Sequence, residues 1–156
     1  MKKTKDHAEI PDTFKPASRL YSDNSILMHE AIARKAGLSG TDHKYLGLIM
    51  RNGELTAGEL SKMTGLTTGA VTGVIDRLEK KKLVKRQLDK DDRRKVLIVP
   101  NTKMALKILT PLFTELQERT EDLLSSFTEK EIQAIQRYFT EAAVILEEIT
   151  HKLNHD

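Results

Sequence analysis

The chain has 156 residues, of which 38% are apolar, 31% are charged and only 4% are aromatic. This composition is typical of one globular, helix-rich unit and excludes a disordered chain or two independent enzymes. The absence of Cys excludes disulfides, thiolate zinc sites, iron–sulfur clusters and thiol-based sensing of oxidants. Acidic residues follow the N-terminal lysines at the positions where a secretory signal would have its apolar stretch. No segment has the roughly 18 apolar residues of a membrane helix. We therefore expect a cytoplasmic protein without membrane contact.

Positive charge is concentrated in one part of the chain. The net charge is only +3, but ten of the nineteen residues from Arg77 to Lys95 are Lys or Arg, against four acids. Residues 100–156 instead carry 6 basic and 10 acidic side chains. Because a solvated helix face also explains a lone run of charge, the elements around this run decide its meaning.

The N-terminal third predicts an arm and two helices. Residues 1–17 are polar, contain two prolines and show no apolar periodicity, so we predict a flexible arm. Apolar residues at helical spacing then predict a first helix that is capped by Ser18 and stopped by Gly37. A second helix is expected from Thr41 to the turn at Gly53.

Two short helices with a glycine between them come next. Thr56 stands three residues before Glu59, the spacing at which each side chain satisfies a free backbone amide at a helix start. This helix ends before Gly65, and Thr67 or Thr68 can cap the following helix. The two are predicted to form a helix-turn-helix. The inner face of the second helix is expected to consist of Val71, Val74, Ile75 and Leu78.

The periodicity then changes from helical to alternating. Residues 83–88 and 95–99 read as β-strands on either side of the charged run 89–94, so we predict a β-hairpin with a tip longer than two residues. Asn101 is expected to cap a long helix that extends to about Ser125.

A last helix is predicted to begin at Thr128, three residues before Glu131. The two C-terminal helices share a three-four spacing of apolar residues, which suits packing against another helix at a shallow angle, within one chain or between two. The positions are Leu106, Leu109, Phe113, Leu116, Thr120, Leu123 and Phe127, then Ile132, Ile135, Phe139, Ala142, Leu146, Ile149 and Leu153, with Thr120 as the one polar interruption.

A helix-turn-helix followed by a hairpin and long helices is the element order of a winged helix, which binds DNA through the second helix of the pair. Threonines on that helix can contact phosphates or thymine methyl groups, and its glycines allow either close approach to DNA or tight packing in the protein. Arginines at the hairpin tip can enter the minor groove. The predicted DNA contacts are Thr56, Thr67, Thr68, Gly69, Thr72, Gly73, Arg77, Arg93, Arg94 and Lys95.

Acidic residues at the hairpin tip need a separate explanation, since they would repel phosphate. The spacing of Asp91 and Asp92 from the neighbouring arginines suggests that they fix the arginine side chains geometrically.

These residues resemble the MarR family of bacterial transcription regulators. The most specific parts are the stretch TTGAVTGVIDRLEKKKLVKR at residues 67–86 and the stretch DKDDRRKVLI at residues 89–98. The second stretch holds the family's Asp-x-Arg-x-x-x-aliphatic wing pattern as Asp92, Arg94 and Ile98. The resemblance extends over nearly the whole chain from about residue 18.

The resemblance implies a mainly α fold with a small β-hairpin, in which the first and last two helices form an intertwined dimer. The corresponding divisions are a flexible arm at 1–17, a dimerisation helix at 18–40, a winged helix-turn-helix lobe at 41–100 and dimerisation helices at 101–156.

The resemblance also implies a function. A homodimer would occupy a palindromic operator and act as a repressor, with double-stranded DNA as its partner and no cofactor. Asp76 is expected to pair with the wing arginine. Release of DNA by a small aromatic or anionic effector is a further implication. The candidate effector-binding residues are Tyr21, His29, Tyr45 and Met50, although a place in the core or in an interface is the more common role for such residues.

Rival functions have weaker support. The sequence shows no phosphate-binding glycine loop, zinc-protease motif or nucleophile elbow, so we do not expect an enzyme. His151 and His155 have a spacing that can bind a metal on a helix, and His29 or His43 could contribute to a sensor site, which leaves a metal-responsive regulator of the same fold as an alternative. A helical interaction protein that does not bind DNA would leave the threonine-rich helix and the hairpin arginines without a purpose.

Overall fold

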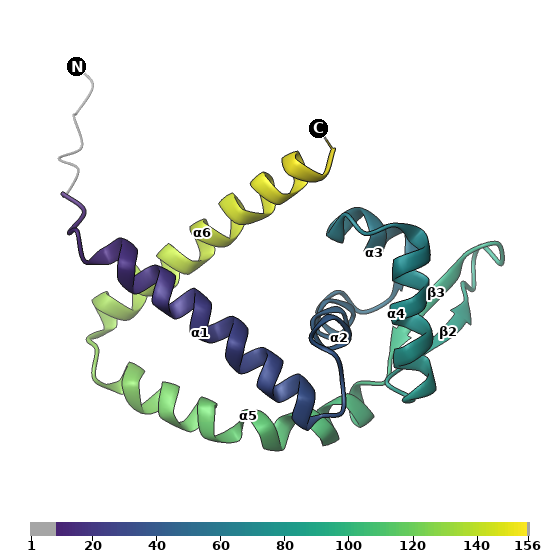
Figure 1. Ribbon diagram of the computed structural model, residues 1–156, viewed down its shortest axis with the longest axis horizontal. Coiled ribbons are helices and arrows are strands. Elements are labelled where there is room, and N and C mark those ends of the chain that lie inside the picture. The colour runs from purple at the N-terminus through teal and green to yellow at the C-terminus, as the bar shows by residue number, and fades with distance from the viewer. Residues whose placement is uncertain (1–8, 156) are drawn as a thin grey trace.

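The computed structural model describes residues 9–155; the first eight residues of the predicted arm lie outside this range. A winged helix-turn-helix lobe stands at one end, and the long helices α1, α5 and α6 form a stem, in which α6 runs from the far end back toward the lobe (Figure 1). The elements in chain order are α1 (Phe14–Lys35), α2 (Gly40–Asn52), β1 (Leu55–Thr56), α3 (Ala57–Thr64), α4 (Thr68–Lys80), β2 (Val84–Leu88), β3 (Val96–Pro100), α5 (Thr102–Ser125) and α6 (Glu129–His155).

The first two helices begin earlier than predicted. Helix α1 starts at Phe14 instead of after Ser18, and Pro16 lies in its first turn, where the missing N–H would have no helical partner. Residues 14–17 of the predicted arm are therefore helical. Helix α2 is capped by Ser39, whose hydroxyl accepts a hydrogen bond from the Asp42 amide at 3.0 Å, and not by Thr41.

The other predicted helix starts are confirmed. Thr56 and Glu59 form the reciprocal capping box of α3, and Gly65 ends that helix in the left-handed conformation at φ +69°. Thr67 caps α4. Asn101 caps α5, which continues through Pro111 to Ser125.

The hairpin belongs to a three-stranded antiparallel sheet with strand order β1-β3-β2. Strands β2 and β3 pair as predicted, with Arg86 opposite Ile98 and Val84 opposite Pro100. Strand β1 was not predicted, because two residues cannot show alternation; it pairs with β3 through Leu55 and Thr56.

The hydrophobic core lies in the lobe. All four inner-face residues predicted for α4 are buried, and they pack with side chains from α2, α3 and the sheet. The stem is covered far less: α5 buries only Ala105 and Leu109, and no side chain between residues 129 and 154 is fully buried. Within the described range no helix is both long and apolar enough to cross a membrane.

An aromatic cluster joins the stem to the lobe. His29 of α1 and His43 of α2 approach to 3.3 Å between Nδ1 and Nε2, and both rings lie against Phe113 of α5. Burial, followed by the nearby His29, lowers the pKa of His43. The His43 Nδ1 atom is buried without a hydrogen-bond partner in the described structure, so the cluster favours a neutral imidazole.

We therefore expect acid to destabilise this junction. The pKa of His43 is below its ordinary 6.5 in the folded chain, so unfolding takes up a proton once the pH falls toward and below that value. The contribution of His43 to the stability of the folded chain is complete above the pKa of the unfolded chain, and it is lost as the pH falls toward the lower pKa of the folded chain. The melting temperature should fall between roughly pH 7.5 and roughly pH 5.5, and His43→Phe should reduce this fall. Identical pH profiles of parent and variant would contradict the assignment.

Candidate nucleic-acid interface

The N-terminal half of α4 exposes small residues only. Because its apolar side chains are buried in the lobe, Thr67, Thr68, Gly69 and Thr72 are exposed on the opposite side. The free amides and the positive end of the helix dipole lie at the same end of α4. The arrangement provides a smooth helical surface with an electropositive start.

Packing does not account for the two glycines of α4. A Cβ added to Gly69 would meet nothing within 4 Å, and one added to Gly73 would meet only the tip of the Arg77 side chain at 3.5 Å. The explanation by tight packing against a neighbouring helix is therefore wrong for both positions. At each glycine no side chain projects from the surface of α4, at a cost of about 1 kcal/mol in helix propensity relative to Ala.

Two of the threonines predicted to contact DNA donate their hydroxyl hydrogen to an acceptor within the protein. The Thr56 hydroxyl donates to Glu59 Oε2 at 2.8 Å and accepts from the Glu59 amide, so it has no hydrogen left for a phosphate. The Thr72 hydroxyl donates to the Thr68 carbonyl at 2.9 Å, which leaves its methyl group and its oxygen lone pair for a ligand.

Arg77 has a protein partner that was not predicted. Its Nε and Nη2 donate to both carboxylate oxygens of Asp42 on α2, at 2.8 to 3.1 Å. Arg77, predicted as a DNA contact, is therefore held side-on in a fixed orientation. The signal for this pairing is absent from the sequence because the partners are 35 residues apart.

The expected pairing of Asp76 with the wing arginine is wrong in this structure. Asp76 accepts a hydrogen bond from Arg86 of β2 at 2.5 Å, and Glu79, one turn later on α4, contacts the same guanidinium. Strand β2 returns alongside α4 and brings Arg86 next to both acids, whereas Arg94 lies beyond the strand at the hairpin tip. The pair thus fixes the strand against α4.

Acidic residues organise the wing tip, as predicted for Asp92. Its carboxylate accepts hydrogen bonds from the backbone amide and Nε of Arg94, at 3.1 and 3.0 Å. Asp89, which was not predicted, accepts from the amides of Asp91 and Asp92 and so shapes the turn. For Asp91 the structure shows only the hydrogen bond that its backbone amide donates to Asp89, and no contact with an arginine.

These contacts keep the tip acids charged. Hydrogen bonds from Arg94 hold the pKa of Asp92 below its usual value, and backbone hydrogen bonds do the same for the pKa of Asp89. Arg94 itself is 92% exposed. The wing therefore presents an oriented guanidinium to solvent, flanked by the exposed Arg93 and Lys95.

The four candidate effector residues do not surround one cleft. Tyr45 is buried in the core of the lobe, and Met50 packs against that core. Tyr21 is exposed beside Phe139 of α6, and His29 belongs to the aromatic cluster with His43. Helical periodicity cannot separate residues that face a cleft from residues that face a core, which is why these four were grouped.

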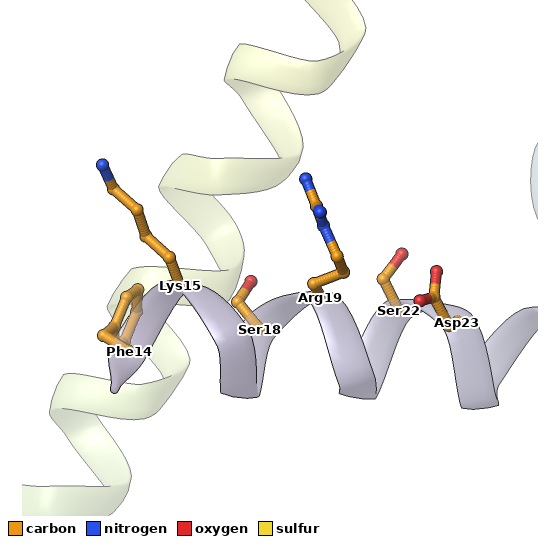
Figure 2. A pocket seen from close by; sticks show the side chains of 6 residues that line it. All are labelled: Phe14, Lys15, Ser18, Arg19, Ser22 and Asp23. Atoms are coloured by element: carbon orange, nitrogen blue, oxygen red, sulfur yellow. The ribbon is translucent and has the colours of Figure 1, made fainter. Parts of the chain in front are cut away.

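An open recess along α1 is no substitute for such a cleft. Figure 2 shows its six lining side chains, which all come from α1, with Lys15 and Arg19 extending away from the helix. A small-molecule site needs convergent groups from several elements. One helix face does not provide them.

Metal ligands are not gathered either. Among residues 9–154, whose side chains the structure describes, no group of three or more His, Cys, Asp or Glu is placed to hold a metal ion. The His155 side chain lies outside this set, so the proposed pair with His151 is not described.

Comparison with solved structures shows the same fold elsewhere. A MepR mutant from S. aureus has a TM-score of 0.72 at 21% identity, and the match covers 88% of this chain and 99% of that chain. A MarR family protein from Bacillus stearothermophilus has a TM-score of 0.65 at 22% identity, with 89% and 99% covered. Another MepR mutant, bound to an oligodeoxyribonucleotide, matches with a TM-score of 0.58 at 21% identity over 88% of this chain and 99% of that chain.

Sequence comparison shows closer relationships. The HTH-type transcriptional regulator YcgE of Bacillus subtilis, itself uncharacterized, is 41% identical over 146 residues, which cover 94% of both chains. The regulator MhqR of the same organism is 28% identical over 116 residues, or 74% of this chain and 79% of MhqR. The MarR family model matches residues 36–95, which include the helix-turn-helix and most of the wing. The chain belongs to the MarR family of transcription regulators and is not an enzyme.

Proposed function

We propose that this chain is a sequence-specific DNA-binding repressor that acts as a homodimer on a palindromic operator. The observation that carries the proposal is the pairing of two surfaces on one lobe: the low, threonine-lined face of α4 and the oriented Arg94 at the wing tip.

Helix α4 fits the role of the recognition helix. A helix can enter the major groove when its exposed face is not blocked by side chains, and Gly69 and Gly73 keep this face low. Thr67 and Thr68 at its start are placed to contact phosphates or bases, and Thr72 offers a methyl group to thymine. The N-terminal residues of such a helix are those nearest the base edges.

The wing fits a minor-groove contact. Arg94 is held by Asp92 and yet remains exposed, so it can enter a narrow groove of negative potential with little loss of side-chain freedom. Arg93 and Lys95 add charge for phosphate contacts beside it. The DNA-bound MepR relative of the same fold supports this use of the lobe.

The stem supports the homodimer. Large apolar side chains of α1, α5 and α6 stay exposed in the single chain, an amount of surface that a monomer rarely leaves uncovered. We therefore assign dimerisation to the stem helices and DNA binding to the lobe. The exposed residues are Phe14, Leu20, Tyr21, Ile26, Leu27, Leu106, Leu116, Leu123, Tyr138, Phe139, Val144, Ile145, Leu146, Ile149 and Leu153, together with Phe127 between α5 and α6.

Repression follows from occupancy, because a dimer seated on a promoter in the cytoplasm excludes RNA polymerase. An effector, here a small aromatic or anionic molecule, would release the DNA if it binds more tightly to a dimer whose two α4 helices do not match successive grooves.

The wing assignment predicts a loss of DNA affinity for Arg94→Ala. Removal of the minor-groove contact should weaken operator binding by about 1–3 kcal/mol, which is roughly 5- to 150-fold. Fluorescence anisotropy with an operator duplex selected from random DNA measures this change. Lys130→Ala removes an exposed cation in the first turn of α6, outside the lobe, and serves as the control, for which we expect the parental affinity. Equal affinity of Arg94→Ala and parent would show that the wing does not bind DNA.

The stem assignment predicts dissociation by Leu146→Glu. Each chain would lose the burial of one Leu, worth about 1.5 kcal/mol or more, and two-fold symmetry doubles the loss. The dimer dissociation constant should rise by about 100-fold, which sedimentation equilibrium measures. The neighbouring Glu147→Gln is the control and should remain dimeric. A Leu146→Glu variant that stays dimeric as the parent does would place the interface elsewhere.

A further inference from the structure

We propose that Asp42 is a positioning residue for DNA binding: it holds Arg77 so that the free edge of the guanidinium meets a backbone phosphate. This inference rests on the proposed function, because it needs α4 to lie on DNA. It adds a residue from α2, outside the helix-turn-helix and the wing, to the DNA-binding apparatus.

The geometry between the two side chains is specific. Arg77 Nε donates to both Asp42 carboxylate oxygens, at 3.0 and 3.1 Å, and Nη2 donates to Oδ1 at 2.8 Å. Two nitrogens of one guanidinium on one carboxylate fix its plane as well as its distance. This fork cannot be formed by a lysine.

Asp42 and Arg77 differ in how far each side chain is exposed to solvent. Asp42 is only 3% exposed and is the one buried charged residue in the described part of the chain. A buried carboxylate needs an opposite charge, so Asp42 depends on Arg77. The Arg77 side chain stays 53% exposed, so the pairing does not remove it from solvent.

The remaining edge of Arg77 is free to bind. Asp42 uses Nε and Nη2, whereas Nη1 lies beside Gly73, 3.5 Å from the point where a Cβ would stand. The missing side chain at residue 73 thus keeps the space next to Nη1 open on the exposed face of α4. A phosphate approaching this face would meet Nη1 in a fixed orientation, and little side-chain entropy would be lost.

The pair also connects α2 to the recognition helix. Asp42 lies in the first turn of α2, and its neighbour His43 contacts His29 of α1 and Phe113 of α5. Consecutive residues of one turn therefore touch the recognition helix on one side and the stem on the other. Any shift of α2 relative to α4 would move the phosphate contact.

Asp42→Asn tests the proposal because simple electrostatics predicts the opposite sign. Loss of a negative charge near DNA should strengthen binding. If Asp42 positions Arg77, Asp42→Asn should instead weaken operator binding, by about tenfold, at a temperature where circular dichroism shows a folded protein. Asp122→Asn, which removes an exposed carboxylate of the stem, should bind as tightly as the parent.

A double-mutant cycle separates positioning from a purely structural role. Arg77→Met should lower the affinity and reduce the slope of log affinity against log salt by about one. Asp42→Asn should then have no further effect on binding in the Arg77→Met background. Equal losses in both backgrounds, or a lower melting temperature with unchanged affinity, would overturn the proposal.

Arg77→Lys provides a second test if Asp42→Asn does not fold. Lysine keeps the charge but cannot bind the carboxylate and a phosphate with one rigid group, so we expect about fivefold weaker binding with the parental salt slope. Parental affinity of Arg77→Lys would overturn the proposal. Failure of the parent chain to bind any DNA would overturn the proposed function. If Arg94→Ala loses binding while the Asp42 and Arg77 variants bind as tightly as the parent, only the role of Asp42 would be overturned.

Discussion

Burial of one face of α4 is the constraint on which the rest of the lobe depends. Val71, Val74, Ile75 and Leu78 lie in the core, where they pack with side chains from α2, α3 and the sheet. Their burial forces the threonines and glycines of the same helix to face outward. The hydrophobic effect thus selects the surface that we propose faces DNA, although none of the surface residues contributes to the core.

Several acidic residues in the lobe form ion pairs with arginines. Asp42 holds Arg77, Asp76 and Glu79 hold Arg86, and Asp92 holds Arg94. Partly exposed ion pairs contribute little to stability, typically about 0–1 kcal/mol, so their main effect is to set the direction of each guanidinium. This explains why a surface that attracts DNA also carries several carboxylates.

The stem and the lobe are stabilised differently. The lobe has a closed core within one chain, whereas α6 buries no side chain fully and α5 buries only two near the lobe. Contacts between α1 and α6, such as Phe14 with Tyr138, cover only part of the apolar surface. In the proposed homodimer, a second copy of the chain would cover the apolar surface of the stem and fix the distance between the two α4 helices.

Local signals in the sequence determined the helix caps at Thr56, Asn101 and Thr128, the inner face of α4 and the hairpin, because each depends on residues a few positions apart. The contact of Asp92 with Arg94 was predictable for the same reason. Only the tertiary structure decided the partners of Arg77 and Asp76 and the burial of Tyr45. Ion pairs across 10 or 35 residues, and the choice between a core and a cleft, depend on how the elements pack, which no spacing along the chain records.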